Sequence, residues 1–303
     1  MRILFFGTPE FAAVSLKAIV HAGFDVVAVV TAPDKPAGRG QKLKCSEVKE
    51  AALDLNIPVL QPTNLKSEDF AEQLTVINPD LGVVIAFRML PESVWSLPKL
   101  GTVNLHGSLL PDYRGAAPIQ HAIINGETQT GVSTFFLKHE IDTGNIIDQA
   151  ILSIGENENA GSLHDRMMLL GAEVMVNTIS KINQFGAQTP STPQSNLSTK
   201  FAPKIHRDFC ELTNTLSTKD AFNKIRGLSP YPGAWIQSPW GDMKIFEAQP
   251  IELEIESIPS EAFVLIHNRQ ILLKCSDGFL QLNTIQLPGK PRMKSLDFIN
   301  GLK

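Results

Sequence analysis

The stretch RILFFGTPE, residues 2–10, joins a largely apolar run to a helix start. Thr8 can cap a helix and Pro9 suits its first turn, so we predict a strand over residues 2–7 and a helix from about Pro9 to Ala22. The next run, residues 25–31, is continuous and rich in β-branched residues, which is typical of a strand buried on both faces. This order of strand, helix and strand predicts the start of a parallel sheet.

The same alternation continues toward the middle of the chain. A loop rich in proline and glycine, residues 32–44, follows the second strand. Alternating strands and helices favour an α/β fold, a Rossmann-like doubly wound sheet that is mainly parallel. Further strands are predicted at residues 58–60, 80–87, 102–106 and 131–137, and helices near residues 46–55, 68–77, 118–124 and 162–184.

The composition changes after residue 185. Residues 186–195 are polar and punctuated by proline, as in a semi-extended linker. Beyond them, one helix at residues 217–226 precedes several short strand-like segments, which suggests a small β-barrel or sandwich. We therefore predict a catalytic domain at residues 1–185, a linker at 186–203 and a second domain at 204–303. The short strands are expected at residues 234–237, 243–247, 262–266, 271–274 and 279–285.

Length and composition exclude several classes of protein. The 303 residues are 43% hydrophobic and 19% charged, which is ordinary for a globular protein and excludes a disordered chain. No apolar run approaches the roughly 20 residues that span a bilayer, so we expect no membrane contact. The three cysteines lie far apart without a Cys-x-x-Cys, which argues against disulfides and a zinc site and favours the reducing cytoplasm.

A dinucleotide site is disfavoured at the first turn of the predicted sheet. The fingerprint Gly-x-Gly-x-x-Gly needs three glycines, and this turn supplies only Gly7. Pro9 and Glu10 place a ring and a negative charge where a pyrophosphate would dock. An NAD-dependent dehydrogenase is therefore a poor hypothesis.

Asn104 and His106 are candidates for catalysis at the end of a predicted strand. Residues two apart on a strand project to the same side, and open α/β sheets bind ligands at the carboxyl ends of their strands. An amide and an imidazole can together donate hydrogen bonds to an oxyanion. About 36 residues further on, Asp142 could orient the imidazole or accept a proton. Spacing alone leaves structural roles open for all three residues.

Two clusters of cations stand out in a chain whose formal net charge is −4. The base rate favours solvated loops for both, and an anionic partner is the alternative. The first cluster places four cations in ten residues without an acid: Lys35, Arg39, Lys42 and Lys44. The second comprises Lys290, Arg292 and Lys294.

The string HGSLLPDYRGAAPI at residues 106–119, preceded by Asn104, resembles the signature of the 10-formyltetrahydrofolate-dependent formyltransferases. The resemblance is strongest to the members that formylate methionine carried on initiator tRNA. It extends over nearly the whole chain and is more specific in the N-terminal half. The further matching segments are GTPEF at residues 7–11, PDKPAGRG at 33–40, residues 131–144, LSPYPGAW at 228–235 and PGK at 288–290.

This resemblance implies that the chain transfers the formyl group of 10-formyltetrahydrofolate to the α-amine of methionyl-initiator tRNA. By the same resemblance, Asn104, His106 and Asp142 are the catalytic residues. We expect Asn104 and His106 to stabilise the developing oxyanion and Asp142 to fix the imidazole and help to remove the amine proton. The matching folate-binding residues are Ser108, Leu109, Leu110 and Pro111.

The resemblance also gives the basic loop a role. In these enzymes the matching loop enters the acceptor-stem end of the tRNA, so we expect Arg39 to contact RNA and Lys35 and Lys42 to add salt-dependent affinity. The second domain is expected to be an oligonucleotide-binding-like (OB-like) β-barrel, with the second cationic cluster on the tRNA backbone. We expect a monomer that uses no metal.

Three alternatives remain. A folate-dependent formyltransferase that acts on an amino-sugar nucleotide shares the catalytic residues but does not need a basic loop. A glycinamide ribonucleotide formyltransferase would not need the linker and second domain, and a binding module without turnover would not need the catalytic residues.

The chain departs from the family pattern at Arg88, where a glycine is common, and over residues 201–214, where an aromatic Asp-Trp motif is missing.

Overall fold

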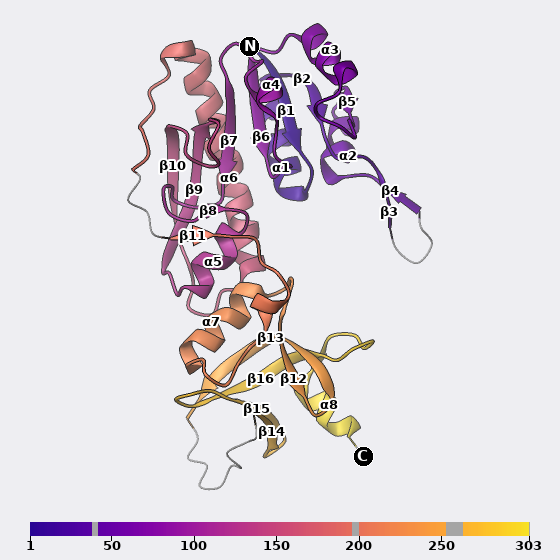
Figure 1. Ribbon diagram of the computed structural model, residues 1–303, viewed down its shortest axis with the longest axis vertical. Coiled ribbons are helices and arrows are strands. Elements are labelled where there is room, and N and C mark those ends of the chain that lie inside the picture. Colours follow the sequence, from indigo (N-terminus) through magenta and orange to yellow (C-terminus); the bar gives the residue numbers. More distant parts are fainter. Residues whose placement is uncertain (38–41, 196–199, 253–262, 303) are drawn as a thin grey trace. The chain divides into compact units, whose positions relative to one another are not determined.

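The computed structural model describes residues 1–37, 42–195, 200–252 and 263–302, and their contacts form two compact units (Figure 1). The first unit contains Met1–Arg114, Gly131–Leu152 and Asp165–Lys200. The second contains Gly115–Thr130, Ser153–His164 and Phe201–Lys303. No helix in the described ranges is both long and apolar enough to cross a membrane.

The first unit is built on a seven-stranded sheet with the order β10-β9-β7-β6-β1-β2-β5. β1 pairs in parallel with both β2 and β6, and β6 pairs in parallel with β7. β9 runs antiparallel to β7, so one side of the sheet departs from the parallel pattern. The prediction of a mainly parallel sheet is confirmed. The strands are β1 (Arg2–Gly7), β2 (Asp25–Val30), β5 (Val59–Leu60), β6 (Leu81–Ile85), β7 (Thr102–His106), β9 (Gln129–Phe136) and β10 (Ile146–Ser153).

Helices cover both faces of this sheet, as a doubly wound fold requires. Leu4 and Phe6 of β1 pack on one side with α3 and α4, and the alternate residues Ile3 and Phe5 are equally buried. α1 and α2 contact each other and the strands β1 and β2. The apolar run at residues 2–7 is therefore buried on both sides. These helices are α1 (Glu10–His21), α2 (Glu47–Asp54), α3 (Glu68–Ile77) and α4 (Glu92–Trp95).

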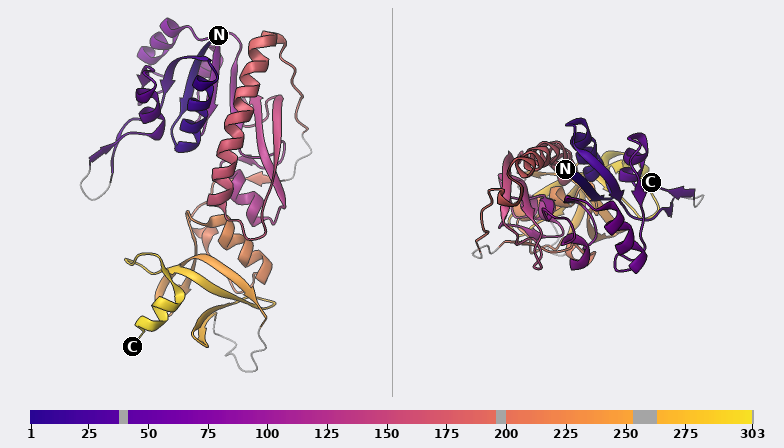
Figure 2. Two further views of the ribbon diagram at one scale, coloured as in Figure 1. Left: turned by 180° about the vertical axis from the view of Figure 1, so that it is seen from behind. Right: turned by 90° about the horizontal axis from the view of Figure 1, so that it is seen from above.

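The long helix α6 (Ala160–Phe185) packs along β7, β9 and β10 (Figure 2). Gly171 on the helix leaves room for Leu105 of β7, because a Cβ there would lie 2.8 Å from the Leu105 side chain. The Thr178 and Thr134 hydroxyls join helix and β9 at 2.6 Å. This face of β7 is therefore filled by α6, and the opposite face remains for a site.

Two local predictions in the first unit are wrong. Helix α1 begins at Glu10, and the preceding position is held by Pro9 in an extended conformation without any side-chain cap, so Thr8 does not cap it. The proline- and glycine-rich loop contains a short hairpin, β3 (Lys35–Ala37) with β4 (Lys42–Lys44). Antiparallel pairing of two three-residue strands leaves no apolar run that a sequence pattern could reveal.

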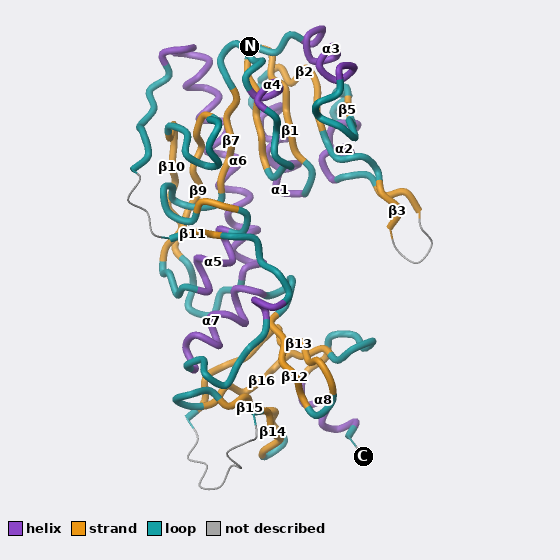
Figure 3. Tube along the Cα trace, in the orientation of Figure 1, coloured by secondary structure: helices purple, strands orange, loops and turns teal. Residues whose placement is uncertain are grey.

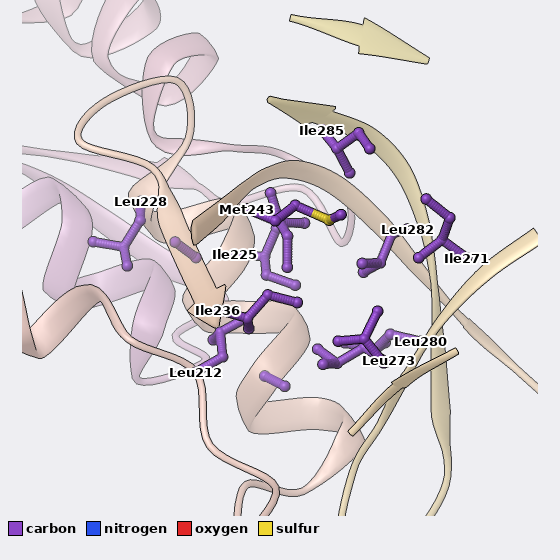
Figure 4. Packing of buried hydrophobic residues seen from close by; sticks show 14 of the residues in the cluster. Leu212, Ile225, Leu228, Ile236, Met243, Ile271, Leu273, Leu280, Leu282 and Ile285 are labelled. Carbon is purple, nitrogen blue, oxygen red and sulfur yellow. The ribbon is translucent and has the colours of Figure 1, made fainter. Parts of the chain in front are cut away.

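The second unit has an antiparallel sheet with the order β12-β13-β16-β15-β14, and β17 pairs with β16. β13 pairs with β12 through its first half and with β16 through its second, with register shifts that let a strand bend. The sheet curves as a half-barrel around apolar side chains from α7 (Thr218–Leu228) and the strands (Figure 4). This confirms the predicted small β-domain. Its strands are β12 (Ala234–Ser238), β13 (Gly241–Ile251), β14 (Val264–His267), β15 (Gln270–Lys274), β16 (Phe279–Gln286) and β17 (Met293–Lys294).

The remaining short elements complete the chain. β8 and β11 form a separate pair of two-residue strands, and the 3₁₀ helix η1 follows α6 directly. The elements are β8 (Arg114–Gly115), α5 (Pro118–Ile124), η1 (Gly186–Gln188), β11 (Phe201–Ala202), η2 (Asp208–Cys210), α7 (Thr218–Leu228) and α8 (Ser295–Gly301).

Candidate active site

Asn104 and His106 lie on the same face of β7, at its carboxyl end. The strand alternates, so Leu105 points to α6 while its two neighbours project from the opposite face of the sheet. Asn104 is half-buried and His106 is 7% exposed. The sequence interpretation placed this pair on one side of the strand, and the structure has it there.

The imidazole of His106 is held by a backbone carbonyl. Its Nε2 lies 2.9 Å from the Tyr113 oxygen, and since a carbonyl only accepts, Nε2 carries the hydrogen. The other ring nitrogen, Nδ1, faces Asp142 with 3.8 Å to Oδ2, and these side chains are 7% and 12% exposed. With Nε2 protonated, Nδ1 of a neutral ring turns a lone pair toward the carboxylate.

Asp142 lies on the loop that joins β9 to β10, and β9 runs antiparallel to β7. The register places the end of β9 opposite Val103, at the amino end of β7, so this loop folds back along the sheet to bring Asp142 to His106. Asp142 has left-handed backbone with φ 55°, which is uncommon outside glycine and which aspartate adopts more readily than most residues. Gly144 allows the loop to press on β9, since a Cβ there would lie 1.6 Å from the Phe136 oxygen.

The segment Ser108–Leu109–Leu110–Pro111 forms a tight turn after β7. Ser108 is fully buried and its hydroxyl donates to the Asp112 carbonyl at 2.6 Å, and Leu110 is 3% exposed. Leu109 and Pro111 are half-buried. Two of the four predicted folate-binding residues thus hold the turn itself, and two keep accessible apolar surface.

Two side chains that sequence reasoning missed support this turn. The Ser133 hydroxyl accepts from the Leu110 amide at 3.0 Å and donates to the Ser108 carbonyl at 2.6 Å. The Gln149 amide of β10 donates to the Leu110 carbonyl and to Ser133. Both residues come from β9 and β10, and no motif marks them, because their role depends on the antiparallel pairing of β7 with β9.

The basic loop corresponds to the hairpin β3–β4. Lys35 is exposed and pairs in register with Lys44, which forms an ion pair with Glu47 at 2.9 Å that raises the pKa of Lys44. Lys42 opens β4. Arg39, the residue favoured for RNA contact, lies outside the described residues.

Three partly buried polar side chains, Asp34, Lys49 and Gln61, hold the base of this hairpin. The Lys49 ammonium contacts Asp34 at 2.6 Å, and the Gln61 amide donates to both Asp34 and the Ala32 carbonyl. Hydrogen bonds from Lys49 and then Gln61 hold the pKa of the Asp34 carboxyl below its usual value of 3.8.

A cavity of about 390 Å³ opens beside this anchor. The cavity lies at the carboxyl ends of β1, β2 and β6. Its lining includes two cationic side chains, Lys35 and Arg88, and the Phe87 ring. The Arg88 guanidinium donates to the Pro62 and Thr63 carbonyls and lies 5.8 Å from the Phe87 centroid. Arg88, which stands where a glycine was expected, therefore connects the edge of this cavity to the loop after β5.

Two residues of the second cationic cluster, Arg292 and Lys294, already have partners within the second unit. Lys294 contacts Glu247 at 2.8 Å, and this contact lowers the pKa of Glu247. The Arg292 guanidinium lies 3.7 Å from the Phe246 ring centroid and donates to the Pro230 carbonyl. Among the described residues, no three His, Cys, Asp or Glu side chains gather as a metal site would require.

Comparison with known proteins assigns the two parts of the chain to one family. A family model described as formyl transferase matches residues 1–179, and one described as formyl transferase, C-terminal domain, matches residues 204–303. The chain is 48% identical over 307 residues to the methionyl-tRNA formyltransferase of Flavobacterium johnsoniae, covering 100% of this chain and 96% of that protein. It is 44% identical to that of Bacteroides thetaiotaomicron over 312 residues, with the same coverage of both chains.

Solved structures share the fold at lower identity. An N-formyltransferase from Helicobacter canadensis, in complex with folinic acid and dTDP-3-aminofucose, matches with TM-score 0.66 and 20% identity over 92% of this chain and 97% of that one. HypX from Aquifex aeolicus in complex with tetrahydrofolic acid matches with TM-score 0.64 and 19% identity over 99% of this chain. The present chain spans about half of HypX, 47%. These likenesses show the fold alone.

Proposed function

The chain belongs to the formyl transferase family, and from this premise we propose its reaction and the residues that carry it. It catalyses the formylation of methionyl-tRNA with 10-formyltetrahydrofolate as donor. The observation that carries this function is the similarity to methionyl-tRNA formyltransferases, which at 48% identity runs over the full chain. The acceptor is the α-amine of methionine on initiator tRNA, and the product, N-formylmethionyl-tRNA, serves translation initiation.

Asn104 and His106 act on the formyl oxygen in this proposal. As the amine adds to the formyl carbon, negative charge grows on that oxygen, and preorganised donors lower the barrier. The Asn104 amide supplies one donor. Because the Nε2 hydrogen of His106 is bound by the Tyr113 carbonyl, the ring turns Nδ1 to the site, and a hydrogen on Nδ1 is the second donor. The Asp142 carboxylate lies 3.8 Å from Nδ1 and orients the ring.

Asp142 has a second task once the new bond forms. The attacking nitrogen must lose a proton, and the carboxylate accepts it directly or through a water. The bond between the formyl carbon and the donor nitrogen then breaks, and the proton that Asp142 accepted passes to that nitrogen, so the charge on the site is restored. The side chains present fit a folate, since Leu109 and Pro111 keep apolar surface for a flat ring while Ser108 and Leu110 hold the turn.

The tRNA contacts are proposed for the hairpin and the second domain. Lys35, Arg39 and Lys42 meet the acceptor end, supported by the charge of the loop and by its Asp34–Lys49 anchor. Residues 1–185 are the catalytic domain, 186–203 the linker and 204–303 the OB-like tRNA-binding domain. We place the monomeric enzyme in the cytoplasm, where aminoacyl-tRNA is used.

The test is formyl transfer from 10-formyltetrahydrofolate to three acceptors in parallel: charged initiator Met-tRNA, charged elongator Met-tRNA and an amino-sugar nucleotide. We expect strong preference for the initiator. Activity on the sugar nucleotide alone would overturn the tRNA assignment and keep the catalytic residues. Asp142→Asn, which keeps the shape of the side chain, should lower kcat on the initiator, and unchanged turnover would remove Asp142 from the mechanism.

A further inference from the structure

The chain segment that follows α6 returns alongside the outer strand of the first sheet (Figure 3). We call residues 191–195 the strap. Thr192 forms an antiparallel bridge with Ile146 at the start of β10, with two backbone hydrogen bonds of 2.8 Å. Composition predicts a linker here, and residues of this segment pair with the sheet next to the loop that carries Asp142.

Gln194 of the strap binds the loop that carries Asp142. Its Nε2 donates to the Asp142 carbonyl at 2.9 Å and to the Gly144 carbonyl at 2.8 Å. Its Oε1 accepts from Arg114, with 3.1 Å to Nε and 2.7 Å to Nη2. Both amide hydrogens and both lone pairs are thus used. Carbonyls only accept and guanidinium only donates, so the orientation of this amide is fixed by its partners.

The partners of Gln194 lie on both sides of the catalytic pair. Arg114 directly follows Tyr113, whose carbonyl holds Nε2 of His106. On the other side, the Asp142 carbonyl, in a left-handed stretch of backbone, accepts from the Gln194 amide. One side chain therefore connects the segment that orients the imidazole with the loop that presents the carboxylate.

We propose that Gln194 is a positioning residue for formyl transfer, which acts by fixing the Asp142 carboxylate against His106. This inference rests on the proposed function. Gln194 does not touch the reacting atoms; it sets the loop through two carbonyls. Displacement of a catalytic group by about 1 Å lowers turnover by about 10²-fold, so loss of this clamp should lower kcat by about 10–100-fold and leave substrate affinity nearly intact.

Gln194→Glu is the sharpest probe because it preserves size and the contact with Arg114. A carboxylate has no hydrogen to donate, so it sets an oxygen against the Asp142 and Gly144 carbonyls. The matched control is Gln188→Glu, the same change at an exposed glutamine in η1 of the same connecting segment. Both variants are compared with wild type for kcat, for KM of Met-tRNA and folate, and for melting temperature.

The expected result is a lower kcat for Gln194→Glu with both KM values and the melting temperature near those of Gln188→Glu. Equal kcat in the two variants would overturn the proposal. A fall in kcat/KM that comes only from a raised KM would overturn it as well. If Gln194→Glu fails to fold, Gln194→Ala replaces it in the same comparison.

A double-mutant cycle with Asp142→Asn tests whether Gln194 acts through Asp142. Residues that act as a unit have non-additive effects, so Gln194→Ala should change kcat little once Asp142 is neutralised. Full additivity would refute a positioning role. A wild-type protein that does not formylate Met-tRNA would instead refute the proposed function, so the two failures are distinguishable.

Discussion

Gly144→Ala tests how closely the catalytic loop must approach β9. A Cβ on residue 144 would lie 1.6 Å from the Phe136 oxygen and 2.8 Å from the Phe136 carbonyl carbon. Both atoms belong to the backbone of β9, which is held in the middle of the sheet and cannot rotate away as a side chain could. The loop must therefore move rather than the strand.

The size of the movement follows from the contact distances. Cβ atoms do not approach other heavy atoms within about 3.0 Å, so the contact must lengthen from 1.6 Å by about 1.4 Å. Gly144 accepts one of the two hydrogen bonds from Gln194 and stands two residues from Asp142, so the carboxylate moves with it. A displacement of this size predicts a loss of about 10²-fold in kcat. Overpacking also costs about 1–3 kcal/mol of stability.

The assay is the initial rate of formyl transfer to charged initiator tRNA, well below the melting temperature of the variant. Gly301→Ala is the control, because a Cβ there meets nothing within 4 Å. We expect Gly144→Ala to lose kcat while its Kd for folate is retained, and Gly301→Ala to match wild type. A folded Gly144→Ala with unchanged kcat would refute the reasoning that ties loop position to turnover.

Three further predictions concern the catalytic histidine, the hairpin and its anchor. His106→Ala removes an oxyanion donor and should lower kcat by about 10²–10³-fold without changing the folate Kd; near-normal turnover would exclude it from the mechanism. Lys35→Ala and Lys42→Ala should each weaken tRNA binding and reduce the slope of log affinity against log salt by about 1; an unchanged slope would mean that neither contacts a phosphate. Asp34→Asn should lower the melting temperature at neutral pH and have little effect in strong acid. Hydrogen bonds from Lys49 and Gln61 lower the pKa of Asp34, so its stabilisation is present above its usual value of 3.8 and is lost as the pH falls through the lowered pKa. A melting-temperature difference that is the same at every pH would contradict this.

Sequence patterns identified the buried elements and missed the exposed ones. β1 and β2 were predictable because both faces of each strand are covered, which leaves continuous apolar runs. β10 was missed because it is the outer strand of the sheet, and the half-buried Asp148 and exposed Gln149 interrupt its apolar residues instead of leaving a continuous run. The apolar pattern follows burial, so strands with little burial give little signal.

Within the site, strand alternation predicted that Asn104 and His106 share a face. Resemblance selected Asp142, but its distance from His106 depends on how the loop between β9 and β10 folds back toward the carboxyl end of β7, which no local pattern encodes. The partner of Nε2 was unpredictable for another reason. It is the backbone carbonyl of Tyr113, a group that every residue carries. Gln194 stands in a polar, proline-rich stretch, and composition there is typical of a linker.

The contact between Gln194 and the catalytic loop also bears on the order in which the enzyme is completed during synthesis. Chains emerge from the ribosome N-terminus first and their domains fold as units. Gln194 comes 52 residues after Asp142, beyond the whole of α6. A nascent chain that ends before residue 194 carries Asn104, His106 and Asp142 but lacks the amide that binds the loop. Of the residues proposed here for the reaction, the last to be translated is therefore Gln194, in a segment that follows all the strands of the first sheet.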